Sequence, residues 1–230
     1  MPLLERFQVI LLDLNGTFMF GQDRFGPGEC FGATYRHLGG TKLVDSAVDR
    51  AVRNTYDAMA ADYDDPNKYD AFPQVADVIR SLHPALLSNE RRLIEEVISI
   101  HDLGHVPDAY AAVLRRLART HRLGLVANIW CKKDRWLQKL ERAGVLDLFE
   151  TLVFSSDHKS MKPSPVLFDL AFRPFGVSKE DVVFVGDSWV HDIEGAKRFG
   201  ISAVWINPAG TGSPPADYVV RDLRDFATGD

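Results

Sequence analysis

The sequence predicts an α/β protein whose core is a doubly wound, Rossmann-like parallel sheet, with an inserted helical cap domain. Three observations support this prediction. Short apolar runs alternate with amphipathic segments along most of the chain, which is typical of a parallel sheet covered by helices on both faces. Polar residues directly follow several of these runs. One long stretch near the N-terminus interrupts the alternation, and this indicates an insertion.

Each expected strand is a short apolar run rich in branched residues. The first begins at Gln8 and ends at Asp13, which is too short for a helix, and the turn-forming pair Asn15-Gly16 follows it. Five further runs have the same character and lie at residues 123–128, 151–155, 181–186, 201–206 and 218–220. The last of them is short and suits an edge strand.

Amphipathic segments separate these runs and predict helices at residues 108–120, 134–143, 164–175 and 192–199. Pro163 and Pro165 stand at the expected start of the third segment, and Gly144, Gly176 and Gly200 follow the ends of helical patterns. Proline at the first turn and glycine just past the last turn are ordinary helix boundaries.

The interval from residue 18 to residue 104 breaks the alternation. It contains two long helical patterns, at 43–61 and 91–100, and no convincing strand. We therefore expect two domains: residues 1–17 with 105–230 form the α/β core, and residues 18–104 form the helical cap.

Composition and charge limit the classes of function. The 230 residues carry a formal net charge of −5, so no excess positive field attracts nucleic acid or an anionic membrane. The two cysteines are too few for a disulfide framework and suit a reducing compartment. No secretory leader and no run of about 20 apolar residues is evident. We expect a cytoplasmic protein; its oligomeric state stays open.

Polar side chains follow the expected strands and should meet at one edge of the sheet, where open parallel sheets bind ligands. Asp13, Asn128 and Asp187 follow three of the strands, Asp192 lies slightly further on, and Lys162 precedes a helix. Clustered carboxylates repel one another unless a cation lies among them, and Mg²⁺ prefers oxygen ligands. A nearby lysine and exposed backbone amides favour a phosphate. The pattern predicts metal-assisted phosphoryl chemistry with Asp13 as the nucleophile.

Four motifs in this order resemble the haloacid dehalogenase superfamily. That family has Asp-x-Asp-x-Thr after the first strand, Ser or Thr after the second, a Lys usually followed by Pro, and Gly-Asp followed shortly by another Asp. The matching segments here are Asp13–Thr17, Val126–Asn128, Lys162-Pro163 and Gly186–Asp192. The resemblance extends over the predicted core, and the insertion lies where the family has its helical cap.

The resemblance implies a role for each of these residues. Asp13 would attack phosphorus and form an aspartyl-phosphate, and Lys162 would neutralise both the nucleophile and the transferred group. Mg²⁺ would be held by Asp13, Asp187 and the backbone carbonyl of Asn15, with Asp192 binding the metal or orienting a water. The remaining phosphate contacts would come from Asn128 and Thr17.

Two positions depart from the family pattern. The second Asp, which protonates the leaving group and later activates water, is Asn15 here, and an amide can do neither at neutral pH. Positioned acid–base catalysis contributes about 10²–10⁴-fold. The second departure is Ala127, which lacks the hydroxyl that would bond the phosphate, a loss of about 1.5–3 kcal/mol that Asn128 can partly replace.

The leading functional prediction is Mg²⁺-dependent hydrolysis of a small phosphorylated metabolite at a reduced rate. One alternative is a catalytically weakened protein that binds phosphorylated ligands or partners without useful turnover. A second is carbon–halogen hydrolysis through Asp13, which needs no metal. Whether Asn15 and Ala127 abolish turnover or only slow it stays open.

Several other side chains fit ordinary structural roles better than chemical ones. We expect His158 and His191 to be exposed loop residues. The polar residues Gln22, Asp23, Arg24 and Glu29 follow the first motif and fit a solvated loop better than a surface that faces the substrate. The four tryptophans suit packing, with Trp189 placed to reach the entrance of a pocket.

Overall fold

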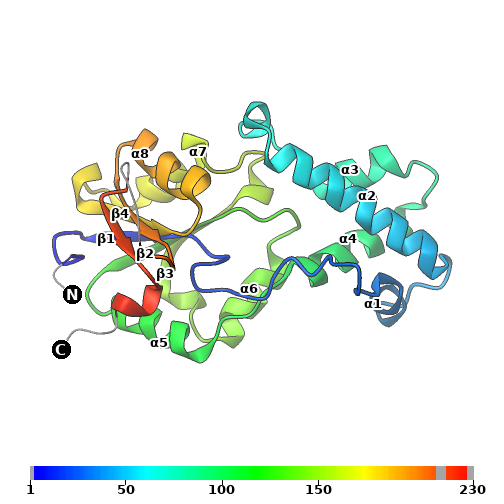
Figure 1. Cartoon of the computed structure of the whole chain (residues 1–230), viewed down its shortest axis with the longest axis horizontal. Coiled ribbons are helices and arrows are strands. Elements are labelled where there is room, and N and C mark those ends of the chain that lie inside the picture. Colours follow the sequence, from blue (N-terminus) through cyan, green and yellow to red (C-terminus); the bar gives the residue numbers. More distant parts are fainter. Residues whose placement is uncertain (1–2, 211–215, 227–230) are drawn as a thin grey trace.

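A six-stranded parallel sheet forms the centre of the computed structural model, which describes residues 3–210 and 216–226 (Figure 1). The strands are β1 (Val9–Leu12), β2 (Arg122–Ala127), β3 (Phe149–Phe154), β4 (Val182–Gly186), β5 (Ser202–Ile206) and β6 (Tyr218–Val220). Their order across the sheet is β3-β2-β1-β4-β5-β6. All the strand pairs are parallel, and the predicted strands are confirmed.

Helices cover both faces of this sheet, because the central strands are buried on both sides. In β1, Ile10 and Leu12 belong to one hydrophobic core, whereas Val9 and Leu11 belong to the other. Successive side chains of a strand point to opposite faces, so a continuous apolar run needs a cover on each. The doubly wound arrangement is therefore confirmed.

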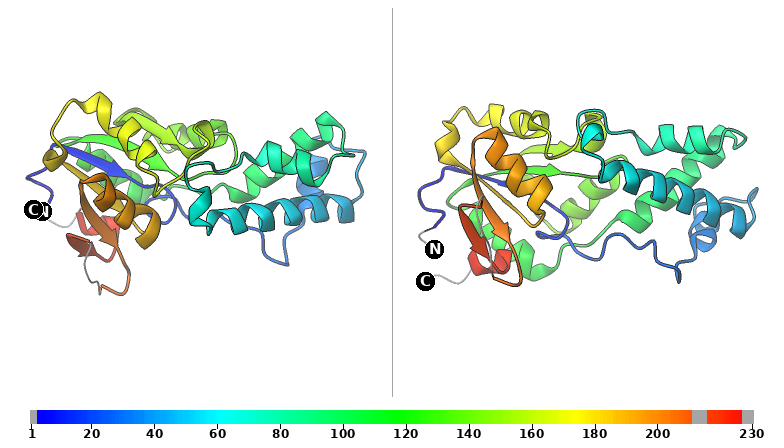
Figure 2. Two further views of the ribbon diagram at one scale, coloured as in Figure 1. Left: turned by 90° about the horizontal axis from the view of Figure 1, so that it is seen from above. Right: turned by 45° about the horizontal axis from the view of Figure 1, so that its top comes forward.

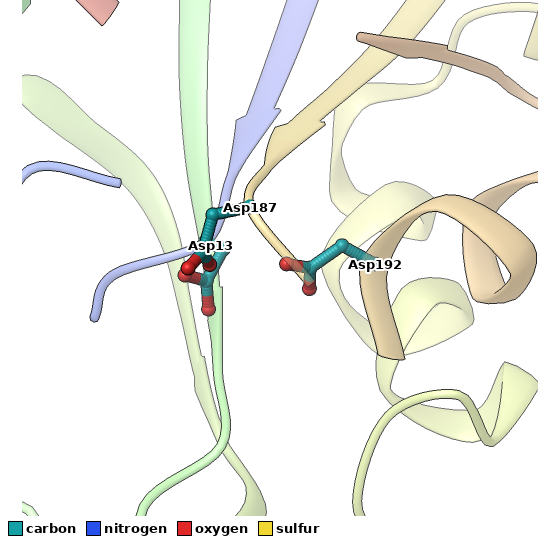
Figure 3. Close-up of side chains that lie close together, drawn as sticks. All are labelled: Asp13, Asp187 and Asp192. Atoms are coloured by element: carbon teal, nitrogen blue, oxygen red, sulfur yellow. The ribbon is translucent and has the colours of Figure 1, made fainter. Parts of the chain in front are cut away.

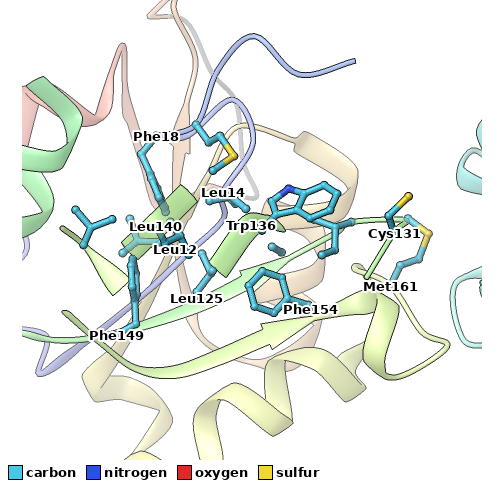
Figure 4. Close-up of a cluster of buried hydrophobic side chains, with 14 of the residues drawn as sticks. Leu12, Leu14, Phe18, Leu125, Cys131, Trp136, Leu140, Phe149, Phe154 and Met161 are labelled. Carbon is cyan, nitrogen blue, oxygen red and sulfur yellow. The ribbon is translucent and has the colours of Figure 1, made fainter. Parts of the chain in front are cut away.

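One core lies under α5 (Asp108–Leu117) and α6 (Asp134–Arg142), and the other under α7 (Pro165–Phe172) and α8 (Gly195–Phe199). In the first core, Trp136 and Leu140 of α6 pack against Leu125 and Phe154 of the sheet (Figure 4). Trp136 is fully buried. These layers fix the strand ends from which the polar side chains project.

Four helices lie between β1 and α5: α1 (Phe31–His37), α2 (Asp45–Tyr63), α3 (Val75–Leu82) and α4 (Ser88–Asp102). They pack on one another and extend away from the sheet as a group (Figures 1 and 2). The two long predicted helices correspond to α2 and α4. Residues 18–104 contain no strand, only isolated bridges that involve Met19 and Phe20. The boundary between a core and a cap domain stays a prediction.

The segment after β4 differs from the expected regular helix. A π-helical turn spans Trp189–Glu194 before α8 begins, and the Ser188 hydroxyl accepts a hydrogen bond from the backbone N–H of His191 at its start. Wider helical turns of this kind are frequent at functional sites. Within the described residues, no helix combines the length and apolar character needed to cross a membrane.

Candidate functional site

Three carboxylates converge at the carboxyl ends of the central strands. Asp13 follows β1, Asp187 follows β4, and Asp192 lies in the π-helical turn. One oxygen from each lies within 4.8 Å of the others (Figure 3). Asp13 and Asp192 are buried, whereas Asp187 is exposed. The structure thus brings together three of the four residues that the sequence predicts as metal ligands, and it places Asn15 beside the same cavity.

Two glycines allow the carboxylates to approach this closely. A Cβ atom on Gly16 would lie 2.2 Å from Oδ2 of Asp187, and a Cβ on Gly186 would lie 2.4 Å from Oδ2 of Asp192. Gly16 also has a φ of +79°, which side chains with a Cβ rarely adopt. Gly16 therefore makes room for an aspartate of another motif, and Gly186 makes room for the second aspartate of its own motif.

Lys162 lies between two of the carboxylates. Its Nζ is 2.6 Å from Oδ1 of Asp13 and 2.7 Å from Oδ1 of Asp192, and the residue is only 1% exposed. Burial alone would lower the pKa of Lys162, but the two carboxylates outweigh burial and hold the pKa above its ordinary value. Thr17 donates a hydrogen bond to Oδ2 of Asp13 over 3.1 Å. Lys162 is therefore a charged group, and Thr17 helps to fix the orientation of the Asp13 carboxylate.

Two side chains hold the backbone of Lys162. Its N–H donates to Oδ1 of Asn128 over 2.9 Å, and Nδ2 of Asn128 lies 3.3 Å from its carbonyl oxygen. Nδ1 of His191 donates to the same carbonyl over 2.8 Å. His191 is buried, so the expectation that it is an exposed loop residue is wrong, whereas His158 is exposed as expected. Both Asn128 and His191 line the cavity and position the lysine.

The carboxylates carry an unfavourable electrostatic energy that a cation would relieve. Burial raises the pKa of Asp13 to about 6 against the opposing effect of Lys162. Desolvation, together with the charges of Asp13 and Asp192, raises the pKa of Asp187 to about 8. A single lysine therefore does not balance three clustered carboxylates. Hard oxygen donors in this arrangement fit a divalent cation such as Mg²⁺.

Asn15 presents an unsatisfied oxygen at this site. Its Oδ1 is buried and accepts no hydrogen bond from the described residues, although most buried polar atoms have a partner. Asn15 lines the cavity with Asp13 and Lys162. A substrate or water with a hydrogen to donate would therefore find an acceptor here, but Asn15 has no proton to exchange.

A cavity of about 310 Å³ lies over the cluster, and residues 18–104 supply part of its wall. The three clustered carboxylates lie on the side of the cavity formed by the strand ends, together with Lys162 and Asn128. The sequence did not indicate the opposite side, which is lined by Gln22, Asp23, Tyr56, Ala60, Tyr63, Asp64 and Asp102. Positions 56, 60 and 63 have the spacing of one helix face, but residues that only pack in a core show the same spacing. Gln22 and Asp23 line this cavity, so the expectation of a solvated loop misses their position.

The tryptophans divide between packing and the cavity. Trp130 is part of the cavity wall, whereas Trp189 is not and instead contacts Trp205 with a ring-centroid separation of 4.8 Å. Trp136 is core. The structure therefore does not place Trp189 at the entrance of the cavity, where it was expected.

Replacing Asp102 by Asn should stabilise the protein at neutral pH. Burial raises the pKa of Asp102 well above its ordinary value, and the neighbouring Asp23 raises it further. Folding at pH 7 must then either take up a proton or bury a charge, and both cost free energy. We expect Asp102→Asn to unfold about 2–4 °C higher at pH 7 in thermal circular dichroism.

The pH dependence of the difference in melting temperature between Asp102→Asn and the unmodified protein provides the control. Below about pH 4, Asp102 is protonated in the folded protein and increasingly so in the unfolded chain, so the advantage of the variant should shrink there. Asp57→Asn removes a charge from an exposed position one residue from Tyr56 and should change little at either pH. A lower midpoint for Asp102→Asn at pH 7 would mean that the carboxylate stabilises the fold.

Comparison with known proteins agrees with the resemblance to the haloacid dehalogenase superfamily. A family profile described as "Haloacid dehalogenase-like hydrolase" matches residues 29–206. The match begins after the segment Asp13–Thr17, so the assignment of the first motif is supported by its sequence and its geometry and not by this profile. A glyceraldehyde 3-phosphate phosphatase of Methanopyrus kandleri is 30% identical over 182 residues, which cover 72% of this chain and 77% of that protein.

Other comparisons cover different shares of the chain. N-acylneuraminate-9-phosphatase of Mus musculus is 35% identical over 126 residues, and the match spans about half of that relative, 49% of its length. A solved HAD phosphatase from Thermococcus onnurineus is 25% identical, with a TM-score of 0.64, and the alignment covers 97% of this chain and 99% of that one.

The same fold also occurs in dehalogenases. A 2-haloacid dehalogenase from Pseudomonas syringae pv. Tomato is 20% identical over 96% of both chains, with a TM-score of 0.66. At that identity the likeness concerns the fold alone. The family profile covers more than half of the sequence, so this chain belongs to the haloacid dehalogenase-like hydrolases.

Proposed function

We propose that this hydrolase is a Mg²⁺-dependent phosphatase that acts on a small phosphate monoester through Asp13. The observation that supports this most strongly is the position of Asp13, whose carboxylate contacts Lys162 on one side and faces Asp187 on the other. A nucleophile placed between a fixed cation and a metal-binding carboxylate suits attack on a dianionic phosphate. The similarity to an N-acylneuraminate-9-phosphatase and a glyceraldehyde 3-phosphate phosphatase supports the same proposal.

Each residue of the cluster has a role in this proposal. Asp13, Asp187 and the backbone carbonyl of Asn15 would hold Mg²⁺, which when bound would neutralise charge on the phosphoryl oxygens. The two oxygens of Asp192 already accept hydrogen bonds from Lys162 and from the backbone N–H of Ser188. That arrangement suits orienting a metal-bound water better than a direct bond.

The covalent step needs no proton at Asp13 itself. One carboxylate oxygen of Asp13 forms a bond to phosphorus as the bond from phosphorus to the leaving oxygen breaks, and Lys162 stabilises the negative charge throughout. The leaving oxygen then requires a proton, and the later attack by water requires a base. Asn15 supplies neither, so turnover of alkyl phosphates is slow.

A second candidate function is binding of phosphorylated ligands without useful turnover. Asn15 and the missing hydroxyl at Ala127 favour it, because the cavity keeps Lys162 and the carboxylates but lacks both of these groups. Carbon–halogen hydrolysis is a weaker candidate. A haloacid carries a carboxylate, and among the described residues Lys162 is the only lysine or arginine that lines the cavity, where it already pairs with Asp13 and Asp192.

Removal of metal tests the proposal directly. Phosphate release from a panel of phosphate monoesters should require Mg²⁺ and should fall to background in excess chelator, with activity returning when Mg²⁺ is restored. Release of halide from haloacids that is indifferent to chelator would support the dehalogenase alternative. Tight binding of phosphorylated compounds with no phosphate release would support the binding-protein alternative.

A further inference from the structure

A second carboxyl pair lies in the cavity away from the cluster. Asp102, at the end of α4, is 6% exposed, and its side chain shares a hydrogen bond with the carboxyl of Asp23. Asp23 is exposed on the segment that follows β1. Both residues line the cavity, and the proposed phosphoryl chemistry uses neither of them.

This pair lacks a cationic partner. Among the described residues no basic side chain contributes to the charge state of either carboxyl, and the two acids only share a hydrogen bond with each other. Burial raises the pKa of Asp102 for this reason. Buried carboxylates are ordinarily paired with a cation, so a cavity that keeps such a pair unneutralised has room for a positive group from outside.

Aromatic rings form the wall next to this pair. The rings of Tyr56 and Trp130 lie 5.5 Å apart between centroids, and those of Tyr63 and Trp130 lie 6.1 Å apart. All three line the cavity. Tyr56 is fixed from behind by the ring of Phe25, whose centroid is 4.4 Å away. Ring faces attract cations, and ammonium groups are commonly recognised by aromatic rings combined with carboxylates.

The total charge of the lining argues in the same direction. Among the described residues that line the cavity are six aspartates, at positions 13, 23, 64, 102, 187 and 192, against one lysine. A bound divalent cation and Lys162 would offset only part of the charge of the phosphate and its nearest carboxylates. The remaining acids would repel an anionic leaving group.

We propose that the substrate of this phosphatase is a phosphate monoester whose leaving group carries an ammonium group, bound between the carboxyls of Asp23 and Asp102 and the rings of Tyr56 and Trp130. This inference rests on the proposed phosphatase function and adds the class of substrate. The phosphate end lies at Asp13 and Lys162, and the ammonium end lies against residues 18–104 and Trp130. Specificity therefore comes chiefly from the inserted segment, and chemistry comes from the strand ends.

Non-hydrolysable phosphonates separate binding from turnover. Aminopropyl-, aminobutyl- and aminopentylphosphonate are each compared with the alkylphosphonate in which a methyl group replaces the ammonium group, by calorimetry with Mg²⁺ present. We expect at least one amine to bind about tenfold more tightly than its matched alkyl compound, as a charge-assisted hydrogen bond provides. The corresponding carboxyalkylphosphonate should bind most weakly.

Variants of the cavity residues test which side chains produce the preference for the amine. In Asp102→Asn the advantage of the amine should fall to about threefold, the share that the ring faces and the exposed carboxyl of Asp23 supply. Tyr56→Leu should lower it as well through loss of the ring. Asp57→Asn makes the same charge change at an exposed position outside the cavity and should retain the full preference.

The outcomes distinguish this inference from the proposed function. If alkyl- or carboxyalkylphosphonates bind as tightly as the amines, the ammonium inference is wrong, and the phosphatase proposal is decided separately by Mg²⁺-dependent phosphate release. If Asp102→Asn weakens binding of Mg²⁺ itself and leaves the amine preference intact, the carboxyl pair is a metal site and the inference is wrong. If no phosphonate binds and no phosphate monoester is hydrolysed, both proposals fail.

Discussion

Replacing Asn15 by Asp should raise the turnover of alkyl phosphates by about 10²–10⁴-fold, which is the ordinary contribution of a positioned acid–base group. Asn15 lines the cavity beside Asp13, and its Oδ1 is buried without a partner, so a carboxyl of nearly the same shape fits there. A protonated carboxyl can donate to the leaving oxygen. Once ionised, the same group can take a proton from the attacking water.

The two kinetic constants should respond differently to the leaving group. For an aryl phosphate, whose leaving group needs no proton, kcat/KM should change little in Asn15→Asp, because this constant reports formation of the phosphoenzyme. Its kcat should still rise, because water must attack the aspartyl-phosphate in every case. Steady-state assays of both substrate types measure this. Asn54→Asp, an exposed change of the same kind on α2, should leave both constants unaltered.

The opposite result has a definite meaning. If Asn15→Asp changes neither constant and the unmodified protein already turns over alkyl phosphates rapidly, another group supplies the proton and Asn15 is not the limiting residue. Loss of activity in Asn15→Asp would indicate that one more carboxylate in this crowded cluster harms the metal site.

Replacing Lys162 by Met should both destabilise the protein and remove activity. Lys162 is 1% exposed and bridges Asp13 and Asp192, so its loss leaves two buried carboxylates without their cation. Breaking a buried ion pair by removing one partner costs about 3–5 kcal/mol. Chemical denaturation followed by tryptophan fluorescence measures this change in the free energy of unfolding.

Two further measurements separate charge from packing in this variant. The loss of stability should shrink as the pH falls, because protonation of Asp13 removes its repulsion with Asp192, and Mg²⁺ should restore part of the stability at neutral pH. Lys159→Met is the matched control, since Lys159 is exposed and lies three positions away. A loss of unfolding free energy that depends on neither pH nor Mg²⁺ would mean that Lys162 acts through packing alone.

The sheet and the position of the cluster could be predicted because their signals are local in the sequence. A parallel strand buried on both faces is a continuous apolar run, and Val9–Leu12 is such a run ending directly at Asp13. The carboxyl ends of parallel strands share one edge, so Asp13 and Asp187 were expected at the same edge once both strands were assigned, and the strand order of the structure makes them neighbours.

The features that could not be predicted from the sequence depend on contacts between distant segments. Helices α1 and α3 have only seven and eight residues, too few for a periodic pattern to stand out. The burial of His191 depends on the carbonyl of Lys162, which is 29 positions away. Asp23 and Asp102 are separated by most of the insertion, and no spacing rule brings them together. The substrate side of the cavity could therefore be found only from the folded chain.

The most direct test of Asp13 as the nucleophile is capture of its phosphorylated form. The protein is incubated with an aryl phosphate and Mg²⁺, quenched in acid, digested, and examined by mass spectrometry. Because the leaving group needs no acid and Asn15 cannot activate water, we expect phosphate to accumulate on the peptide that contains Asp13. The signal should be absent in Asp13→Asn and in excess chelator, and smaller in Asn15→Asp. Phosphate release that persists in Asp13→Asn, or a label on another residue, would contradict the account.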